Sequence, residues 1–413
     1  MTSADTGTTD GQLESPSLIG QELPLDIGAV AHGGHCVARH EGRVIFVRHA
    51  IPGERVLARI TEGEADSRFL RADAVEVLSR SPDRVQRPCP YAGPELCGGC
   101  DFQHVSLPRQ RSLLADVVRE QLERLAGIDW PVRVEPVPGD VDGLRWRTRV
   151  GFVAAANGKP GLRRHRSHDV IPVADCLIGH TELPDVTSAL DAGAASAQAV
   201  VSGTGERVVV TDPKAAPVVT EQAAGRTWQL HASDFWQVHP GAADALVAAV
   251  IDGLQPAAGE RCWDLYAGVG LFAGALAERI GLGGAVVAVE SHRRAAESAR
   301  RNLADLSQVR VVTERVDRFA RSRIAQGRLD LVVLDPPRAG AGAAAIRGIT
   351  KRRPRAIAYV ACDPAALARD LATLSEGGYE LVSLRAFDIF PMTAHVECVA
   401  ICERRPSASE RNT

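Results

Sequence analysis

The sequence predicts an α/β protein in which a Rossmann-like parallel sheet follows an OB-type β-barrel and a central β-rich domain. Short alternating strands fill residues 20–80, and strands and turns dominate residues 130–230, with one Ala-rich helix around residues 189–200. From residue 231 onward, strands alternate with helical patterns, as in a doubly wound sheet. The chain of 413 residues is too long for one typical domain.

The first domain is predicted over residues 15–80. Apolar and polar residues alternate there in four runs, which Gly33-Gly34 and Pro52-Gly53 separate as turns. The runs cover residues 23–27, 42–48, 54–60 and 70–78. This spacing is typical of a small barrel of a kind that often binds oligonucleotides. The alternative is a barrel that only packs on its neighbour.

The second domain, predicted over residues 81–230, contains a group of cysteines. Cys89, Cys97 and Cys100 share one short loop with glycines, and Cys176 follows at a distance. Four thiolates suit a [4Fe-4S] cluster or zinc, which the spacing alone does not separate. The nine cysteines of the chain are an odd number, which favours metal binding and catalysis over disulfides. The alternative is a set of small buried cysteines without a metal.

The third domain, predicted over residues 231–405, opens with a glycine turn. A strand ends at Asp264, and Gly268 and Gly270 lead into a helix. The next strand ends in Glu290, about 20 residues beyond the glycines, where an acid would hold a ribose diol. Two further strand ends are followed by Asp317 and Asp335. This series predicts a nucleoside ligand, with S-adenosylmethionine favoured, and no phosphate-binding Gly-x-x-x-x-Gly-Lys motif is present.

A fifth strand ends at Cys362, which we expect to face the same cleft as Asp335 because ligands bind beyond the carboxyl ends of parallel strands. A thiolate that adds to carbon 6 of uracil makes carbon 5 nucleophilic towards a methyl sulfonium. A general base must then remove the carbon 5 proton, and Glu397 begins the last β run. The alternatives are a packing cysteine and an ordinary surface carboxylate.

Charge is distributed unevenly along the chain, whose formal net charge is only -3. Three basic clusters could hold phosphates, or could simply be solvated surface. They are Arg145, Arg147 and Arg149; Arg163, Arg164 and Arg166; and residues 351–355. No apolar run of about 18 residues occurs, and residues 1–20 are polar, so we expect a cytoplasmic protein without a membrane partner.

Residues 15–403 resemble the RNA uracil-5-methyltransferases, which modify ribosomal and transfer RNA. The motifs Phe235-Trp-Gln-Val-His239, Asp335-Pro-Pro-Arg338 and Cys362-Asp-Pro364 carry the resemblance. It implies a TRAM barrel, a class I methyltransferase domain, Cys362 as nucleophile and Glu397 as base. It further implies [4Fe-4S] ligation by Cys89, Cys97, Cys100 and Cys176, and S-adenosylmethionine contacts from Gln237, Tyr266, Glu290, Asp317 and Asp335. The helix over residues 107–126 would pack on the catalytic domain.

The chain departs from the family pattern at three places. Ala361 stands where serine usually precedes the nucleophile, His239 replaces asparagine, and the gap from Cys89 to Cys97 is longer than in the commonest form. The cysteine pattern resembles the branch that acts on 23S ribosomal RNA, which favours that RNA over transfer RNA. Other interpretations are a cytosine-5 methyltransferase, an amine methyltransferase, and a non-catalytic RNA-binding iron-sulfur protein.

Overall fold

The computed structural model describes residues 16–405. The chain divides into two compact units, one ending at Arg84 and the other beginning at Val85, and each is described by itself. The polar segment over residues 1–20 contributed to the expectation of a cytoplasmic protein, and its residues 1–15 lie outside the described residues. Within residues 16–405, no helix has the length and apolar character needed to cross a membrane.

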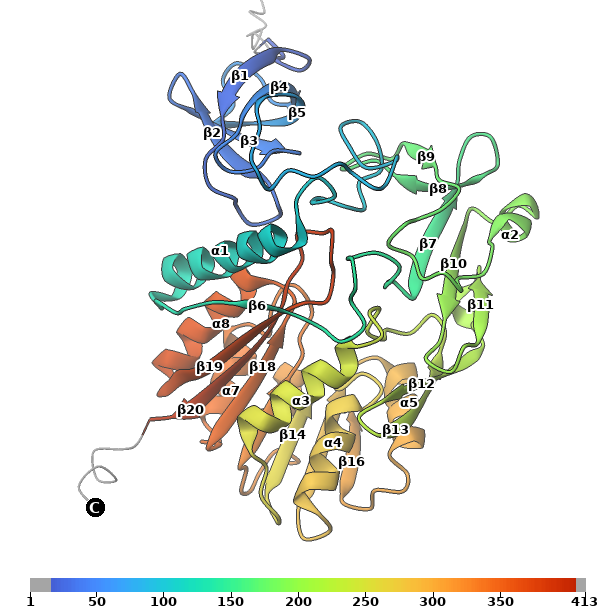
Figure 1. The fold of residues 1–413 in the computed structure, drawn as a ribbon. Helices are drawn as coiled ribbons and strands as arrows, with labels where there is room; N and C mark the ends of the chain where they lie inside the picture. Colours follow the sequence, from blue (N-terminus) through green and yellow to red (C-terminus); the bar gives the residue numbers. More distant parts are fainter. Residues whose placement is uncertain (1–15, 406–413) are drawn as a thin grey trace, which may run out of the picture. The chain divides into compact units, whose positions relative to one another are not determined.

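The first unit is a curled five-stranded sheet, drawn in blue in Figure 1. Its order is β1-β4-β5-β3-β2, and β1 also contacts β2, so the two edges approach each other. The strands are β1 (Glu22–Asp26), β2 (Cys36–His40), β3 (Arg43–Arg48), β4 (Arg55–Glu62) and β5 (Phe69–Ser79). All four predicted strand runs are confirmed, and β2 is an additional strand. Its alternating residues Cys36 and Ala38 are buried in the core.

The second unit is built on an eight-stranded sheet of order β16-β15-β14-β17-β18-β20-β19-β6. The strands from β16 to β18 run parallel, and β20 lies antiparallel to β18. Their bounds are β6 (Val134–Pro136), β14 (Arg261–Leu265), β15 (Ala285–Glu290), β16 (Val309–Thr313), β17 (Leu331–Leu334), β18 (Ala356–Ala361), β19 (Tyr379–Asp388) and β20 (Glu397–Arg404). The predicted alternation of strands and helices is confirmed.

Helices pack against this sheet and connect its parallel strands (Figure 1). Helix α1 contacts α8 and β6 although it precedes the sheet in the chain. Its buried residues recur at helical spacing, for example Leu114, Val118 and Leu122. The helices are α1 (Leu107–Ala126), α3 (Ala242–Leu254), α4 (Leu271–Ile280), α5 (Arg293–Asn302), α6 (Val316–Phe319), α7 (Ala343–Thr350) and α8 (Pro364–Glu376).

A second sheet and a hairpin lie between α1 and α3 in the chain. The sheet has the order β11-β10-β7-β8-β9, and β12 pairs with β13. The elements are β7 (Arg149–Ala154), β8 (Pro160–Arg163), β9 (Val170–Pro172), α2 (Thr187–Asp191), β10 (Ser196–Val201), β11 (Arg207–Val210), the 3-10 turn η1 (Pro213–Ala215), β12 (Val218–Ala223) and β13 (Arg226–His231). The predicted Ala-rich helix is wrong over most of its length, because β10 is buried between β7 and β11 and sheet pairing overrides the helix propensity of alanine.

Candidate active site and cysteine pocket

The glycine turn between β14 and α4 forms one wall of the candidate cofactor site. Gly268 and Gly270 have φ angles of 54° and 99°, a region that disfavours residues with a Cβ. At Gly270 a Cβ would also lie 2.7 Å from the Leu303 side chain. The turn therefore brings bare backbone to the carboxyl end of the sheet, where a ligand can approach closely.

Asp264 lies beneath this turn and was not among the predicted site residues. Its side chain is fully buried; one oxygen accepts the N–H of Ala273 at 2.8 Å, and the other has no hydrogen-bond partner. Burial raises the pKa of Asp264 to about 8. The carboxyl group thus fixes the start of α4. Its position at the end of a strand, immediately before a glycine turn, was the signal that could have identified it.

Glu290 is the last residue of β15, and its side chain is hydrogen-bonded to the glycine turn after β14. Its two oxygens accept the N–H groups of Gly268, at 2.9 Å, and His292, at 2.6 Å. Oε1 also accepts the Ser291 hydroxyl at 3.4 Å, whereas Oε2 accepts only the N–H of Gly268 within the described part of the chain, so acceptor capacity for a ribose hydroxyl remains at Oε2. The predicted position of this acid beside the glycine turn is therefore found in the structure.

Gln237 belongs to a segment that α5 ties to this edge of the sheet. Arg294, four residues after Glu290, donates to Asp234 at 2.7 Å and to the Ser233 hydroxyl at 2.8 Å. Gln237 itself is buried and lines a cavity between the β12–β13 hairpin and the end of β10. The other predicted cofactor contacts do not line this cavity. The ion pair between Arg294 and Asp234 thus joins the segment that contains Gln237 to the start of α5.

His239, which stands where the family pattern has asparagine, is buried. Its ring stacks on Trp146 with centroids 6.0 Å apart, and Nδ1 accepts the N–H of Gly241 at 3.1 Å. Its Nε2 has no hydrogen-bond partner, and burial lowers the pKa of the imidazole. Neutral histidine therefore fills this site as a packing residue that also caps the turn before α3.

Tyr266 and Asp317 flank the turn with different degrees of exposure. Tyr266 follows β14 with a φ of 63°, and burial raises its pKa to about 12. Asp317 lies in the first turn of α6, where it accepts from Arg315 Nε at 3.0 Å. Asp317 is half-buried, with its side chain 38% exposed.

Cys362 and Glu397 are brought together by the pairing of β18 with β20. Ala361 lies opposite Cys398 in the antiparallel register, so the next position along pairs Cys362 with Glu397. The parallel strand β17 ends beside β18 and leads directly into Asp335. One thiol and two carboxyl groups therefore meet at this end of the sheet.

Arg338 is the cation that faces this group. It lowers the pKa of both Cys362 and Glu397, although burial outweighs it at each. Burial, reinforced by Glu397, raises the pKa of Cys362 to about 11, and burial raises that of Asp335 to about 7. The pKa of Glu397 is raised well above its usual value by burial and then by Asp335. Burial therefore favours the neutral forms of these side chains.

A buried network holds the loop that follows Arg338. Asp370 on α8 accepts the N–H groups of Ala341 and Gly342 at 2.7 and 3.2 Å, and the Tyr359 hydroxyl at 2.6 Å. Tyr359 lies in β18, so the same network ties the loop to the strand that presents Cys362. Asp370 and Tyr359 are positioning residues that the sequence did not single out.

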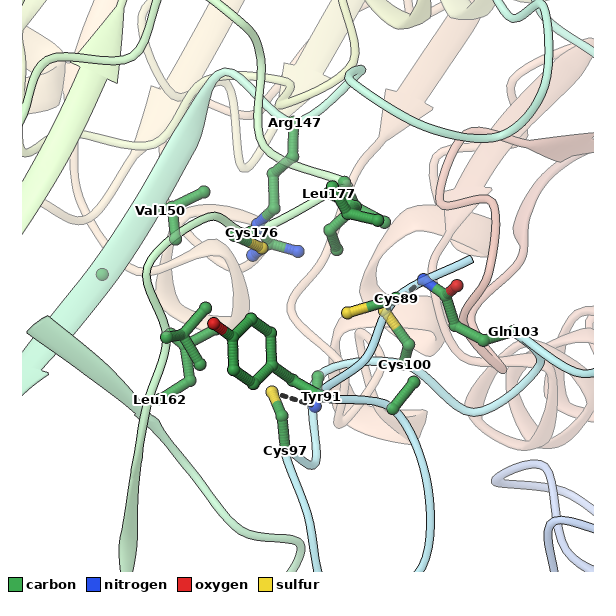
Figure 2. A pocket seen from close by; sticks show the side chains of 15 residues that line it. Cys89, Tyr91, Cys97, Cys100, Gln103, Arg147, Val150, Leu162, Cys176 and Leu177 are labelled. Atoms are coloured by element: carbon green, nitrogen blue, oxygen red, sulfur yellow. Dashed lines mark hydrogen bonds between the residues drawn. The ribbon is translucent and has the colours of Figure 1, made fainter. Parts of the chain in front are cut away.

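The four predicted ligand cysteines line one cavity of about 190 Å³ (Figure 2). The Gln103 side chain donates to Cys100 Sγ at 3.5 Å, and the N–H of Gly99 donates to Cys97 Sγ at 3.4 Å. Figure 2 shows the sulfurs of Cys89 and Cys100 close together and the Arg147 guanidinium beside Cys176. The structure thus gathers Cys176 with the loop cysteines across nearly 80 residues of chain.

These thiols fit a group bound by several sulfurs, because cysteines from two separate segments converge on one hollow with hydrogen-bond donors aimed at the sulfur atoms. Among residues 16–405, however, no group of three or more His, Cys, Asp or Glu side chains is arranged to hold a single metal ion. The iron-sulfur cluster therefore stays a prediction.

All three predicted basic clusters are partly engaged in ion pairs. Arg149 is buried against Glu221 at 2.7 Å, and Arg355 pairs with Glu260 at 2.6 Å. In the second cluster, Arg164 pairs with Asp169 at 3.2 Å. These guanidinium groups form ion pairs within the protein, so fewer arginines remain as candidates for phosphate contacts than the sequence suggested.

Comparison with known proteins places both units in families. Residues 16–75 match the TRAM domain, and residues 222–405 match the family described as tRNA (Uracil-5-)-methyltransferase. An RNA methyltransferase of Streptomyces coelicolor is 48% identical, with 94% of each chain covered. The 23S rRNA (uracil(1939)-C(5))-methyltransferase RlmD of Pseudomonas putida is 33% identical, over 93% of this chain and 94% of the relative.

A solved structure shares the architecture. The Pyrococcus abyssi tRNA (uracil-54, C5)-methyltransferase, in complex with S-adenosyl-L-homocysteine, superposes with a TM-score of 0.67 at 23% identity, covering 91% of this chain and 99% of that one. The predicted class I methyltransferase fold with an amino-terminal TRAM domain is confirmed. The chain belongs to the RNA (uracil-5-)-methyltransferase family.

Proposed function

We propose that this enzyme methylates carbon 5 of one uridine in 23S ribosomal RNA, with Cys362 as nucleophile and Glu397 as general base. The observation that carries this mechanism is the register of β18 and β20, which sets the thiol beside the carboxyl group. Arg338, which lowers the pKa of both groups, supports the same assignment.

The first step forms a bond between Cys362 Sγ and carbon 6 of the uracil ring. The π electrons of the carbon 5–carbon 6 bond move into an enolate, and carbon 5 becomes nucleophilic. Because burial favours the neutral thiol, its proton must leave before or while the bond forms. Arg338, which lowers the pKa of the thiol, stabilises the thiolate at this point.

The last step releases the product. Glu397 accepts the proton from carbon 5, the double bond returns between carbons 5 and 6, and the Cys362 thiolate is expelled. A buried carboxylate is a stronger base than an exposed one, since burial raises its pKa. The environment of Glu397 thus suits proton removal from carbon.

S-adenosylmethionine, when bound, supplies the electrophilic methyl group. We assign its contacts to Gln237, Tyr266, Glu290, Asp317 and Asp335, of which the last four lie at or after the ends of β14 to β17. The spare acceptor capacity of Glu290 Oε2 suits a ribose hydroxyl, and the turn at Gly268 and Gly270 permits close approach of backbone. Asp335 connects these strand ends to the thiol, because it lies at the end of β17 beside β18.

We further assign a [4Fe-4S] cluster to Cys89, Cys97, Cys100 and Cys176, with zinc as the alternative. Convergence of the four thiols on one cavity supports this assignment. When bound, the group would fasten the loop over residues 89–100 to the segment around Cys176. No step of the methylation passes through it.

The choice of 23S ribosomal RNA rests on the relative RlmD, which covers nearly the whole chain. Transfer RNA is the second candidate, supported by the names of the matching family and of the solved structure. A ribosomal RNA substrate agrees with the expected cytoplasmic location.

Substitution Cys362→Ala should abolish formation of 5-methyluridine, because the ring can no longer be activated at carbon 6. Purified protein and labelled S-adenosylmethionine are incubated with separate pools of unmodified ribosomal and transfer RNA, and nucleosides are identified by mass spectrometry. Cys402→Ala, a buried thiol on β20 away from the cleft, is the control and should retain activity. Label in 5-methylcytidine or a methylated amine would overturn the base assignment, and label only in transfer RNA would overturn the choice of RNA.

The rate should rise with pH between about pH 6 and about pH 9, because Cys362 and Glu397 must both lose protons to act and burial raises both pKa values. The pKa of Cys362 near 11 predicts no plateau within that range. Arg338→Gln should move the rise to higher pH, since Arg338 lowers both pKa values. A kcat/KM that is constant or falls over this range would contradict these roles.

Protein purified without oxygen should contain about four iron atoms per chain and show a broad visible absorbance. Cys176→Ala should lose most of both, while Cys262→Ala, a buried thiol on β14, should keep them. A colourless, iron-free and fully active preparation would contradict the cluster, and stoichiometric zinc would replace it with a zinc site.

A further inference from the structure

The outer face of the amino-terminal barrel carries aromatic side chains. Strands β3 and β5 run parallel, with Phe46 opposite Arg71 and Val44 opposite Phe69. The alternate residues of both strands form the core; they are Ile45, Val47, Leu70 and Ala72, each at most 3% exposed. Because side chains alternate across a strand, Phe46, Phe69 and Arg71 share the outer face.

These three residues form a compact cluster, which we call the Phe69 platform. The rings of Phe46 and Phe69 are 5.6 Å apart and meet edge to face at 77°. The guanidinium carbon of Arg71 lies 5.7 Å from one ring centroid and 5.4 Å from the other. Glu62 lies 3.4 Å from Arg71 Nε, so the arginine is braced over both rings.

The platform is not ordinary core packing, because Phe69 remains 43% exposed. Two partly exposed rings offer far less apolar area than a stable protein interface requires. An unpaired nucleobase matches the platform better: it has a flat apolar face, stacks on phenylalanine and arginine planes, and carries a phosphate that a basic surface attracts. Arg39, on the same face of the neighbouring strand β2, is exposed and supplies positive charge.

We propose that the Phe69 platform stacks one unpaired nucleotide of the substrate RNA, away from the uridine that is methylated. The proposal rests on the proposed RNA methyltransferase function and deepens it, since it specifies that the substrate has a single-stranded segment outside the target position. An isolated stem-loop that lacks such a segment would then bind more weakly. The stacking is sequence-tolerant, because every base has a π face.

The test measures binding of the full-length protein to a fluorescent 12-nucleotide oligoadenylate, which contains no uridine, and to a blunt 12-base-pair RNA duplex. Phe69→Ala should weaken oligoadenylate binding by about 5-fold to 150-fold, the range found for loss of one base–aromatic stack. Duplex binding should change by less than about twofold, because paired bases are not available to stack. The salt dependence of oligoadenylate binding should stay the same, since no phosphate contact is lost.

Two variants control for damage to the fold. Phe69→Trp should keep or improve binding, because a larger aromatic surface remains. Leu78→Ala, on the same strand and 49% exposed, should bind like the wild type. The proposal is overturned if Phe69→Ala binds oligoadenylate within about twofold of the wild type, if duplex binding falls equally, or if Leu78→Ala loses as much.

Methylation assayed in parallel separates the two claims. A wild-type protein that forms no 5-methyluridine would refute the proposed function. Normal methylation by the wild type, together with unchanged oligoadenylate affinity in Phe69→Ala, would refute the platform alone.

Discussion

The antiparallel pairing of β20 with β18 is the constraint on which the candidate active site depends. A parallel sheet ends with its strand-end residues at one edge, and Cys362 follows β18 at that edge. Only a strand running the opposite way can begin at the same edge, and β20 does so with Glu397. A slip of one residue would turn either side chain to the other face of the sheet, so the register and the chemistry are fixed together.

Burial makes Glu397 a stronger base, but it also makes the charged forms of the buried groups less stable. Three acidic groups, the thiol of Cys362 and the carboxyls of Asp335 and Glu397, lie at one end of the sheet, where burial leaves charge poorly solvated. Their raised pKa values favour the neutral forms, and Arg338 offsets part of the penalty when Cys362 or Glu397 loses a proton. The Asp370–Tyr359 network keeps the loop after Arg338 in place, so that this guanidinium stays near the groups whose charged forms it stabilises.

Local patterns in the sequence were sufficient to predict four strands of the barrel, the parallel strands of the larger sheet, the glycine turn and the residues at the strand ends. Acids at the ends of parallel strands must share an edge, so Glu290 and Asp335 could be placed without coordinates. Asp264 carried such a signal in its position before the glycine turn, whereas Asp370 could not be assigned, because its role arises from which backbone N–H groups lie nearby in three dimensions. The supposed helix around residues 189–200 failed for a related reason: alanine favours a helix locally, whereas pairing with β7 and β11 decides the outcome.

The claim that Cys362 and Glu397 act in sequence on one ring can be tested most directly by trapping the intermediate between them. Glu397→Gln keeps the size of the side chain but cannot accept the carbon 5 proton, so methylated RNA should remain covalently bound to Cys362. Denaturing electrophoresis with labelled RNA should show a protein–RNA adduct that accumulates in Glu397→Gln and disappears in the double variant with Cys362→Ala. Release of 5-methyluridine at the wild-type rate without any adduct would contradict the account.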